Sequence, residues 1–301
     1  MSELLKNKTV CIVGLGLLGT SLALALRGAS CRVVGWSRRP EVRNYALEIG
    51  AVSATAENPA ELLAMADLTV LCLPIPAIIS FMKQHAADFA PHSTVTDIGS
   101  VKSVIVESGE AALTPYQVNF VGSHPMAGTE KSGPYAAFAT LYRHAEVFVT
   151  PTAETAAESV ALVQTMWETV GTSVRLIAPA PHDELVAHTS HISHLLALGL
   201  TLSVLDEPNP DLRQMRYSGC ATGFRDTSRI ASSSPEMWRE IIEANQSAVL
   251  QAIAEFEHHF SNIKQLIADG RFEEFQALFA VGKSLRDSWI EYKNREHNCN
   301  W

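Results

Sequence analysis

The segment 121-VGSHPMAGTEKSG-133 combines a histidine with glycines and polar side chains that a hydrophobic core does not accommodate. His124 follows a predicted strand, and Pro125 favours an extended backbone at that position. We therefore expect the imidazole at the carboxyl edge of a sheet, where open α/β sheets bind their ligands. A neutral imidazole beside a hydride acceptor can take the proton of a hydroxyl group whose carbon loses hydride. His124 is thus predicted to be a catalytic base whose activity falls on acidification.

A second polar segment, 219-GCATGFRDTSRI-230, contains Arg225 and Arg229. A guanidinium group binds a carboxylate through two parallel hydrogen bonds. Two arginines among glycines and hydroxyl groups in an acidic chain therefore indicate a site for a substrate carboxylate. For at least one of them, a salt bridge to Asp226 or to a helix end is the alternative.

The helical segment 182-HDELVAHTSHISH-194 contains four histidines. Their spacing is compatible with metal ligation, but no carboxylate completes a familiar ligand set. We predict no metal site.

A glycine motif near the N-terminus, 14-GLGLLG-19, matches GxGxxG. It follows one predicted strand, opens a helix and precedes a second strand at 31–36, as in a dinucleotide-binding βαβ unit. Glycines at these positions allow a tight turn and a close approach of a pyrophosphate to the helix N-terminus. The predicted cofactor residues here are Gly14, Gly16, Leu17, Leu18 and Gly19. A glycine-rich turn without a ligand is the alternative.

The end of the second strand, 35-GWSRRP-40, bears on which dinucleotide is bound. An NAD site usually has an acidic residue there, whereas this chain has Ser37 followed by Arg38 and Arg39. A hydroxyl and guanidinium groups would bind the 2′-phosphate that a carboxylate would repel. The sequence therefore favours NADP over NAD, although a solvated turn that accepts both cofactors is also compatible.

Two later strand ends should also face the cofactor, because they lie at the same edge of the predicted sheet. In 72-CLPIP-76 these residues are Leu73 and Pro74, and in 97-DIGSVK-102 they are Ser100 and Lys102. The hydroxyl of Ser100 and the ammonium of Lys102 are expected to reach the nicotinamide or the substrate. Ser100 could equally be a helix N-cap.

The elements that must position these residues change type along the chain. Near-continuous apolar runs are predicted as strands, and the segments between most of them have a helical pattern. The strand candidates are 9–14, 31–36, 68–74, 93–98, 118–123, 145–150 and 173–177, and the helical segments are 17–28, 41–49, 58–65, 76–88, 101–112 and 154–169. From Asp183 onward only helices are expected. We predict an α/β fold with a Rossmann-type, mostly parallel sheet domain over 1–178 and an all-α domain over 179–301.

A long amphipathic helix is predicted over 241–267, where apolar positions recur at three- and four-residue steps. Ser234 is the expected N-cap, with Pro235 at the first helical position. The apolar face is larger than a small helical domain can cover. We therefore predict a homodimer through the helical domain.

The composition excludes several classes of partner. The 301 residues carry a net charge of −9, which argues against nucleic acid. The five scattered cysteines indicate reduced thiols in a cytoplasmic protein. The apolar run 9–26 resembles a signal peptide or membrane span, but its glycines are better explained by the dinucleotide motif. No membrane association is predicted.

Five segments in this order carry a resemblance to a known family: GLGLLG, DIGSVK, GSHPMAGTEKSG, HDELVAHTSHISH and GFRDTSRIASSSPEMW. The chain resembles the prephenate and arogenate dehydrogenases of tyrosine biosynthesis from residue 9 to about 290. HPMAGTEKSG and GFRDTSRI are the specific parts, whereas many oxidoreductases share the glycine motif. We expect neither a chorismate mutase segment before the dinucleotide domain nor a regulatory domain after the helices.

The resemblance implies an oxidative decarboxylation with hydride transfer to the nicotinamide. It implies that His124 accepts the hydroxyl proton, that Arg229 holds a substrate carboxylate and that Ser100 contacts the nicotinamide or the substrate hydroxyl. The other residues it places around the substrate are Thr129, Glu130, Ser190, His191, His194 and Trp238, with Trp238 reaching into the partner's site. Prephenate and arogenate remain equal alternatives as substrates.

Two other functions are compatible with a Rossmann domain followed by helices. A β-hydroxyacid dehydrogenase or imine reductase relies on a lysine or on a donor from the helical domain, and does not need the HPMAGTEKSG loop. A non-catalytic NADP-sensing protein has no need of His124 together with two candidate carboxylate-binding arginines.

Overall fold

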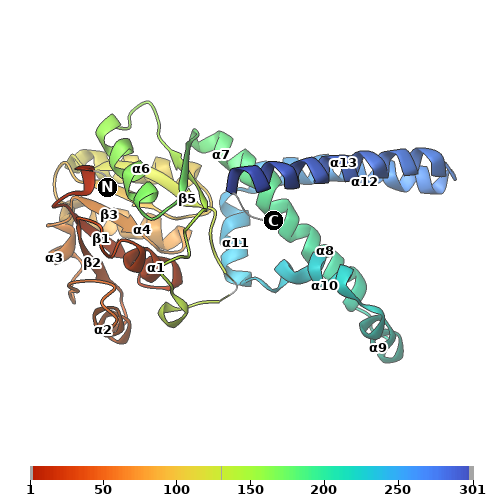
Figure 1. The fold of residues 1–301 in the computed structure, drawn as a ribbon, viewed down its shortest axis with the longest axis horizontal. Coiled ribbons are helices and arrows are strands. Elements are labelled where there is room, and N and C mark those ends of the chain that lie inside the picture. Colours follow the sequence, from red (N-terminus) through yellow and green to blue (C-terminus); the bar gives the residue numbers. More distant parts are fainter. Residues whose placement is uncertain (1–2, 130, 298–301) are drawn as a thin grey trace. The chain divides into compact units, whose positions relative to one another are not determined.

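The computed structural model describes residues 3–129 and 131–297, and these form one seven-stranded sheet with helices around and after it (Figure 1). The strand order is β2-β1-β3-β4-β5-β6-β7. β1 to β5 are parallel, whereas β6 runs antiparallel to β5 and parallel to β7. The strands are β1 (Thr9–Val13), β2 (Arg32–Trp36), β3 (Leu68–Leu71), β4 (Thr94–Asp97), β5 (Asn119–Pro125), β6 (Glu146–Thr150) and β7 (Ser173–Leu176). All seven predicted strands are confirmed.

Helices cover both faces of the sheet because side chains alternate along the buried strands. In β1, Val10 and Ile12 pack into one apolar cluster with residues of α1 and α6, while Cys11 and Val13 pack into the other with residues of α4 and α5. The helices of this part are α1 (Leu17–Ala25), α2 (Pro40–Glu48), α3 (Ala60–Leu63), α4 (Ile75–His85), α5 (Ser103–Leu113) and α6 (Ala157–Thr169).

After β7 the described chain is helical, as predicted. α7 (Pro179–Val186), a π-helical turn at Ala187–His191 and α8 (Ile192–Leu205) follow one another without a break. The remaining helices are α9 (Pro210–Gly219), α10 (Thr222–Ser228), the 3₁₀ turn Arg229–Ser232, α11 (Pro235–Ala244), α12 (Gln246–Ala268) and α13 (Phe272–His297). The hydroxyl of Ser234 accepts from the Met237 N–H, which confirms the predicted N-cap.

The expectation of one uninterrupted helix over 241–267 is wrong, because the chain breaks between α11 and α12 at Asn245. Asn245 leaves the helical conformation, with φ −125° and ψ 28°. Its buried amide donates to the Asp183 carbonyl oxygen at 2.9 Å and lies 3.2 Å from His191 Nδ1. A polar side chain with partners in another helix replaces the apolar contact that the periodic pattern suggested.

By its internal contacts the chain divides into two units, Met1–Gln246 and Ser247–Trp301. The first contains the sheet and the helices through α11. The second contains α12 and α13, two long helices joined by a turn in which Gly270 has φ +67° (Figure 1). A domain boundary at 178 stays a prediction, placed where the sheet ends and the helices begin.

One helical stretch of the described chain, Pro179–Leu205, is long and apolar enough to cross a membrane by length and composition alone. Its first half, however, carries His182 and Asp183, which are buried and hydrogen-bonded to residues of the sheet part. The apolar run 9–26, which resembled a signal peptide, forms β1 and α1 in the core.

Candidate active site

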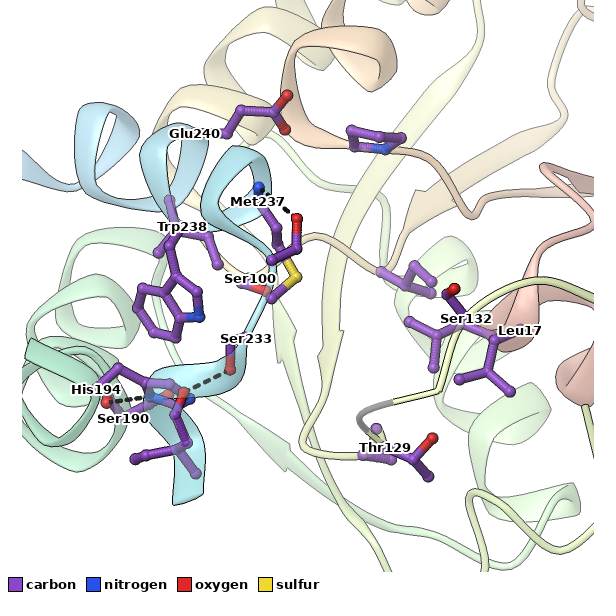
Figure 2. Close-up of a pocket in the computed structure, with 18 of the residues that line it drawn as sticks. Leu17, Ser100, Thr129, Ser132, Ser190, His194, Ser233, Met237, Trp238 and Glu240 are labelled. Atoms are coloured by element: carbon purple, nitrogen blue, oxygen red, sulfur yellow. Dashed lines mark hydrogen bonds between the residues drawn. The ribbon is translucent and has the colours of Figure 1, made fainter. Parts of the chain in front are cut away.

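A cavity of about 1290 Å³ lies within the first unit, where the carboxyl ends of the strands meet α8, α10 and α11. In Figure 2, Leu17 lies on one side of the cavity and His194 and Trp238 on the other. Fifteen of the residues predicted for the site line it: Gly16, Leu17, Leu18, Gly19, Leu73, Pro74, Ser100, His124, Thr129, Ser190, His191, His194, Arg225, Arg229 and Trp238. Glu130 lies outside the described residues.

The glycine turn at the start of α1 has the shape that a dinucleotide requires. Gly14 has φ +98°, and a Cβ there would lie 2.3 Å from the Cys72 carbonyl oxygen. A Cβ at Gly19 would lie 2.0 Å from the Gly14 carbonyl oxygen, whereas one at Gly16 would meet nothing within 4 Å. None of the described side chains caps the first turn of α1, so its N–H groups are available to an anion. Gly14 lies behind the cavity wall and shapes the turn.

The residues expected at a 2′-phosphate lie outside this cavity, at the end of β2. Arg38 and Arg39 are exposed, and Arg39 Nε lies 3.8 Å from Glu41 Oε1. Arg43, from α2, donates to the carbonyl oxygen of Ser37 at 2.8 Å and of Arg38 at 3.3 Å. Three guanidinium groups thus surround this turn. The sequence pattern did not point to Arg43, because its contact depends on the fold of α2 back over the turn.

Lys102 does not reach the cavity, contrary to expectation, because its ammonium is fully buried behind the sheet edge. It forms an ion pair with Asp97, at the end of β4, and donates to the Ser123 carbonyl oxygen at 2.9 Å. Burial lowers the pKa of Lys102 and raises that of Asp97, and the ion pair opposes both shifts. Lys102 therefore ties β4 to β5 directly behind His124 and does not line the cavity.

His124 is held at the cavity by the last residues of β5. The pairing of β5 with β4 ends at Val121, and beyond it His124 pairs only with Phe148 of the antiparallel β6. The imidazole is 8% exposed, and its Nδ1 lies 2.9 Å from Nε2 of His182. The other ring nitrogen, Nε2, is left for the cavity that His124 lines.

Behind His182 lies a carboxylate with several hydrogen bonds. His182 Nδ1 lies 2.8 Å from Asp183 Oδ1, and the two oxygens of Asp183 accept the backbone N–H groups of Lys102 at 2.7 Å and Ser103 at 2.8 Å. These N–H groups belong to the first turn of α5, where the helix dipole favours a negative charge. Asp183 therefore caps α5, connects it to α7 and steadies the turn that carries Ser100.

The surroundings of His124 favour the uncharged imidazole. Burial lowers its pKa well below the usual value, and the neighbouring His182 and Lys102 lower it further. Burial also lowers the pKa of His182, although the hydrogen bond to Asp183 opposes this shift. A neutral imidazole can accept a proton, so the electrostatics agree with the predicted base.

The helical side of the cavity is built around Trp238. Its ring lies 3.9 Å from that of His194 and 5.8 Å from that of His191, measured between centroids. Trp238 therefore packs against two histidines of its own chain, and its reach into a partner's site stays a prediction. His191 is buried against Asn245, and burial lowers its pKa to about 4. His194 Nδ1 lies 3.0 Å from the Ser190 carbonyl oxygen (Figure 2).

The two arginines differ in their surroundings. Arg225 Nε donates to Asp226 at 2.9 Å, and its side chain is 73% exposed. Arg229 has no carboxylate partner within the described part of the chain, and it is close enough to His194 to lower the pKa of that imidazole, after the larger effect of burial. The salt bridge to Asp226, the predicted alternative, is therefore present for Arg225, and Arg229 stays the predicted partner of a substrate carboxylate.

Three contributors to the site were not predicted as site residues: His182, Asp183 and Asn245. His182 was noted only as one of four helical histidines, and Asp183 follows it directly in the sequence. Asn245 occupied a position in an apolar series. A polar amide at such a position could have indicated a buried hydrogen bond. His182 contacts β5, Asp183 contacts α5, and Asn245 contacts α7 and the π-helical turn, and each of these contacts joins segments distant in sequence.

Two family models match the chain, one after the other. Residues 21–176 match the "prephenate dehydrogenase, nucleotide-binding domain" and residues 178–281 match the "prephenate dehydrogenase, dimerization domain". The chain belongs to the prephenate dehydrogenase family. It is accordingly an NAD(P)-dependent dehydrogenase.

Individual members of the family agree with this assignment. The chain is 33% identical to the cyclohexadienyl dehydrogenase of Zymomonas mobilis, over 86% of this chain and 87% of the relative. Prephenate dehydrogenase from A. aeolicus, crystallised with hydroxyphenyl propionate and NAD+, is 33% identical with a TM-score of 0.87, covering 94% of this chain and 99% of that chain. Synechocystis arogenate dehydrogenase is 30% identical with a TM-score of 0.84, covering 94% and 100%.

A more distant structural similarity links the chain to a β-hydroxyacid dehydrogenase, one of the alternative functions considered from the sequence. A 3-hydroxyisobutyrate dehydrogenase from Salmonella typhimurium is 14% identical with a TM-score of 0.54, which shows a shared fold alone.

Proposed function

We propose that this enzyme catalyses the oxidative decarboxylation of prephenate, or of its amino analogue arogenate, in tyrosine biosynthesis, with NADP as the favoured cofactor. The observation that carries the proposal is the convergence of His124, Ser100 and Arg229 on one cavity with the open glycine turn of α1. These residues come from three different parts of the fold, and together they supply a base, a hydroxyl and a cation. Family membership and the similarity to prephenate and arogenate dehydrogenases support the same reaction.

The bound nicotinamide supplies the hydride acceptor. His124 takes the proton of the ring hydroxyl through Nε2 while hydride leaves the hydroxyl-bearing carbon. Carbon dioxide leaves the opposite ring carbon, and the ring becomes aromatic. Arg229 holds a substrate carboxylate, and Ser100 contacts the nicotinamide or the substrate hydroxyl. Trp238 and His194 together form the apolar side of the cavity. Ser190, His191, Thr129 and Glu130 complete the proposed substrate site.

The preference for NADP rests on the charges at the end of β2. Ser37 stands where an NAD enzyme has an acid, and Arg38, Arg39 and Arg43 surround the turn. Arg39 Nε also lies 3.8 Å from Glu41 Oε1. A 2′-phosphate would be attracted by all three guanidinium groups, and NAD lacks that phosphate.

Replacing both Arg38 and Arg39 by alanine is expected to weaken NADP binding by roughly 10-fold, a modest loss because exposed charges are screened. The affinity for NAD should change by less than about 2-fold, because NAD lacks the 2′-phosphate that the two arginines would bind. Fluorescence titration with each dinucleotide measures both constants. Arg32→Ala, at the opposite end of β2, is the matched control for lost positive charge. Equal losses for NADP and NAD would contradict this placement of the phosphate.

One assay tests the proposed reaction against its alternatives. Nicotinamide absorbance is followed with prephenate, arogenate and a 3-hydroxy acid, each with NADP and with NAD. We expect reduction of NADP with prephenate or arogenate, and the ratio of their kcat/KM values ranks the two substrates. Turnover with the 3-hydroxy acid alone would indicate a β-hydroxyacid dehydrogenase. Dinucleotide binding without turnover of any substrate would indicate a sensing protein.

We also propose a homodimer formed through the helical domain. The second unit exposes large apolar side chains, and the family model for 178–281 is described as a dimerization domain. The most exposed of these on α12 and α13 are Leu250, Phe260, Phe272, Phe279 and Leu285, each at least 57% exposed. Large apolar side chains exposed in this number on two helices are typical of a protein interface.

Leu285→Glu, alone or with Phe279→Glu, is expected to shift the protein from twice the chain mass towards the monomer in sedimentation equilibrium. A charge buried in an apolar interface costs several kcal/mol, enough to raise the dimer dissociation constant by roughly 100-fold. Ser284→Glu places the same charge at the neighbouring exposed position and is the control. A wild-type protein that is monomeric at micromolar concentration would refute the dimer.

We place the enzyme in the cytoplasm, without a membrane or nucleic-acid partner. Four cysteines in the described residues, Cys11, Cys31, Cys72 and Cys220, are free thiols, as a reducing compartment allows. The net charge of −9 opposes binding to nucleic acid.

A further inference from the structure

Three side chains form a chain of hydrogen-bonding contacts that begins at the cavity and ends inside the protein. His124 Nδ1 lies 2.9 Å from His182 Nε2, and His182 Nδ1 lies 2.8 Å from Asp183 Oδ1. All three residues are buried, at 8%, 0% and 5% exposure in that order. We propose that His182 and Asp183 are positioning residues that fix the tautomer of His124 and keep its Nε2 unprotonated, ready to accept the substrate proton. The inference rests on the proposed role of His124 as the base.

The direction of each hydrogen bond follows from the carboxylate. Asp183 already accepts the backbone N–H groups of Lys102 and Ser103, and although burial raises its pKa, the hydrogen bonds from His182 and Ser103 lower it more. An ionised carboxylate only accepts hydrogen bonds. His182 must therefore donate from Nδ1, which leaves the Nε2 of a neutral His182 with a lone pair.

The same reasoning fixes the next ring. A lone pair on His182 Nε2 requires a donor, so Nδ1 of His124 carries the hydrogen. In a neutral imidazole the other nitrogen is then unprotonated. That nitrogen, Nε2 of His124, is the one left for the cavity. Without His182, either tautomer could form, and the Nε2–H form cannot act as a base.

The groups around the two rings favour this neutral arrangement. The Lys102 ammonium and His191 disfavour a second positive charge at His124, and Asp97 is already neutralised by its ion pair with Lys102. Around His182 the charged groups are Asp183, Lys102 and Asp97, and the ring of Phe148 packs at 5.7 Å on another side. If His182 became protonated, it would donate to His124 Nδ1 and push the hydrogen of His124 to Nε2. Acidification therefore removes the base in two ways: it protonates His124, and it reverses the hydrogen bond between His182 and His124.

The decisive experiment reads the tautomers directly, without substrate. Long-range ¹H–¹⁵N correlation spectra of the full-length protein labelled with ¹⁵N-histidine distinguish Nδ1–H from Nε2–H rings. His124→Asn and His182→Gln spectra assign the two signals. We expect both rings in the Nδ1–H form at neutral pH. An Nε2–H form for His124 in the wild-type protein would overturn the proposal, whatever the substrate of the enzyme turns out to be.

Kinetics of three variants provide the second readout. His182→Leu replaces the imidazole with an apolar side chain of similar bulk and so removes the hydrogen-bond acceptor for His124. We expect kcat to fall by about 10- to 100-fold, part of the usual acid–base contribution. His182→Gln places an amide oxygen near the former Nε2 and should recover part of the loss. Phe148→Leu removes only the ring contact with His182 and should stay within about 2-fold, because no hydrogen bond is lost.

The outcomes separate the two hypotheses. Wild-type kcat in His182→Leu, or equal losses in His182→Leu and Phe148→Leu, would reduce His182 to a packing role and refute the positioning role. Absence of turnover with prephenate and arogenate in the wild-type enzyme, together with Nδ1–H signals for both rings, would instead refute the proposed function while leaving the tautomer assignment in place.

Discussion

The substitution His124→Asn is expected to lower kcat by about 100- to 10,000-fold, the usual contribution of a general base. Asparagine has nearly the size of histidine and can still contact His182, but its amide does not accept a proton from the substrate hydroxyl. Because His124 lies beyond the pairing of β5 with β4, the strand itself should be little disturbed. Steady-state kinetics measures the effect, with whichever of prephenate and arogenate has the higher kcat/KM in the wild-type enzyme.

Cofactor affinity is the control for this substitution. The glycine turn of α1 and the arginines after β2 do not hydrogen-bond to His124, so the dissociation constant for NADP should remain within about 2-fold. A variant that keeps near-normal turnover would exclude His124 as the base. Loss of NADP binding together with activity would point to a disturbed fold.

The pH dependence of the wild-type enzyme belongs to the same prediction. A base must be unprotonated, so kcat/KM falls as the pH drops through the pKa of His124. Burial lowers that pKa well below the usual value, so the fall should lie below the ordinary histidine pKa of about 6.5. A descent centred above that value would show that a different group controls activity.

The second large effect is expected at Arg229, where replacement by alanine should raise the KM for the substrate by roughly 10- to 150-fold. This range corresponds to the 1.5–3 kcal/mol of a hydrogen bond to a charged group, and about 1.4 kcal/mol changes a constant 10-fold. Arg229 lines the cavity beside His194 and has no carboxylate partner among the described residues, so its charge is available to the substrate. Initial-rate kinetics at saturating NADP separates KM from kcat.

Arg225→Ala is the matched control, because Arg225 lies on the same turn of chain but is paired with Asp226 and largely exposed. Its KM should change by less than about 3-fold, as for other exposed ion pairs. Arg229→Lys keeps the charge without the planar fork and should fall between alanine and wild type. An unchanged KM in Arg229→Ala with a raised KM in Arg225→Ala would exchange the two roles.

Local patterns were sufficient for the elements of the sheet. Apolar runs such as 9–14 and 68–74 have only one favourable position, the interior of a sheet covered on both faces, so their strands could be located without the structure. The glycine motif and the extended His-Pro pair were equally local, because backbone conformation at Gly14 and His124 depends mainly on the residues themselves. The sequence by itself therefore determined the fold class, the cofactor turn and the identity of the candidate base.

Only the tertiary structure decided which polar side chains face the cavity and which face one another. Lys102 and Ser100 lie in the same turn, yet Ser100 lines the cavity and Lys102 is buried against Asp97. Asn245 fitted an apolar series, but it ends a helix to reach Asp183 and His191. Buried polar groups must find partners, and His182, Lys102 and Asn245 each have a hydrogen-bonding partner that lies 21 to 62 residues away in the sequence. Such pairings arise when the chain folds, and no periodicity or short motif records them.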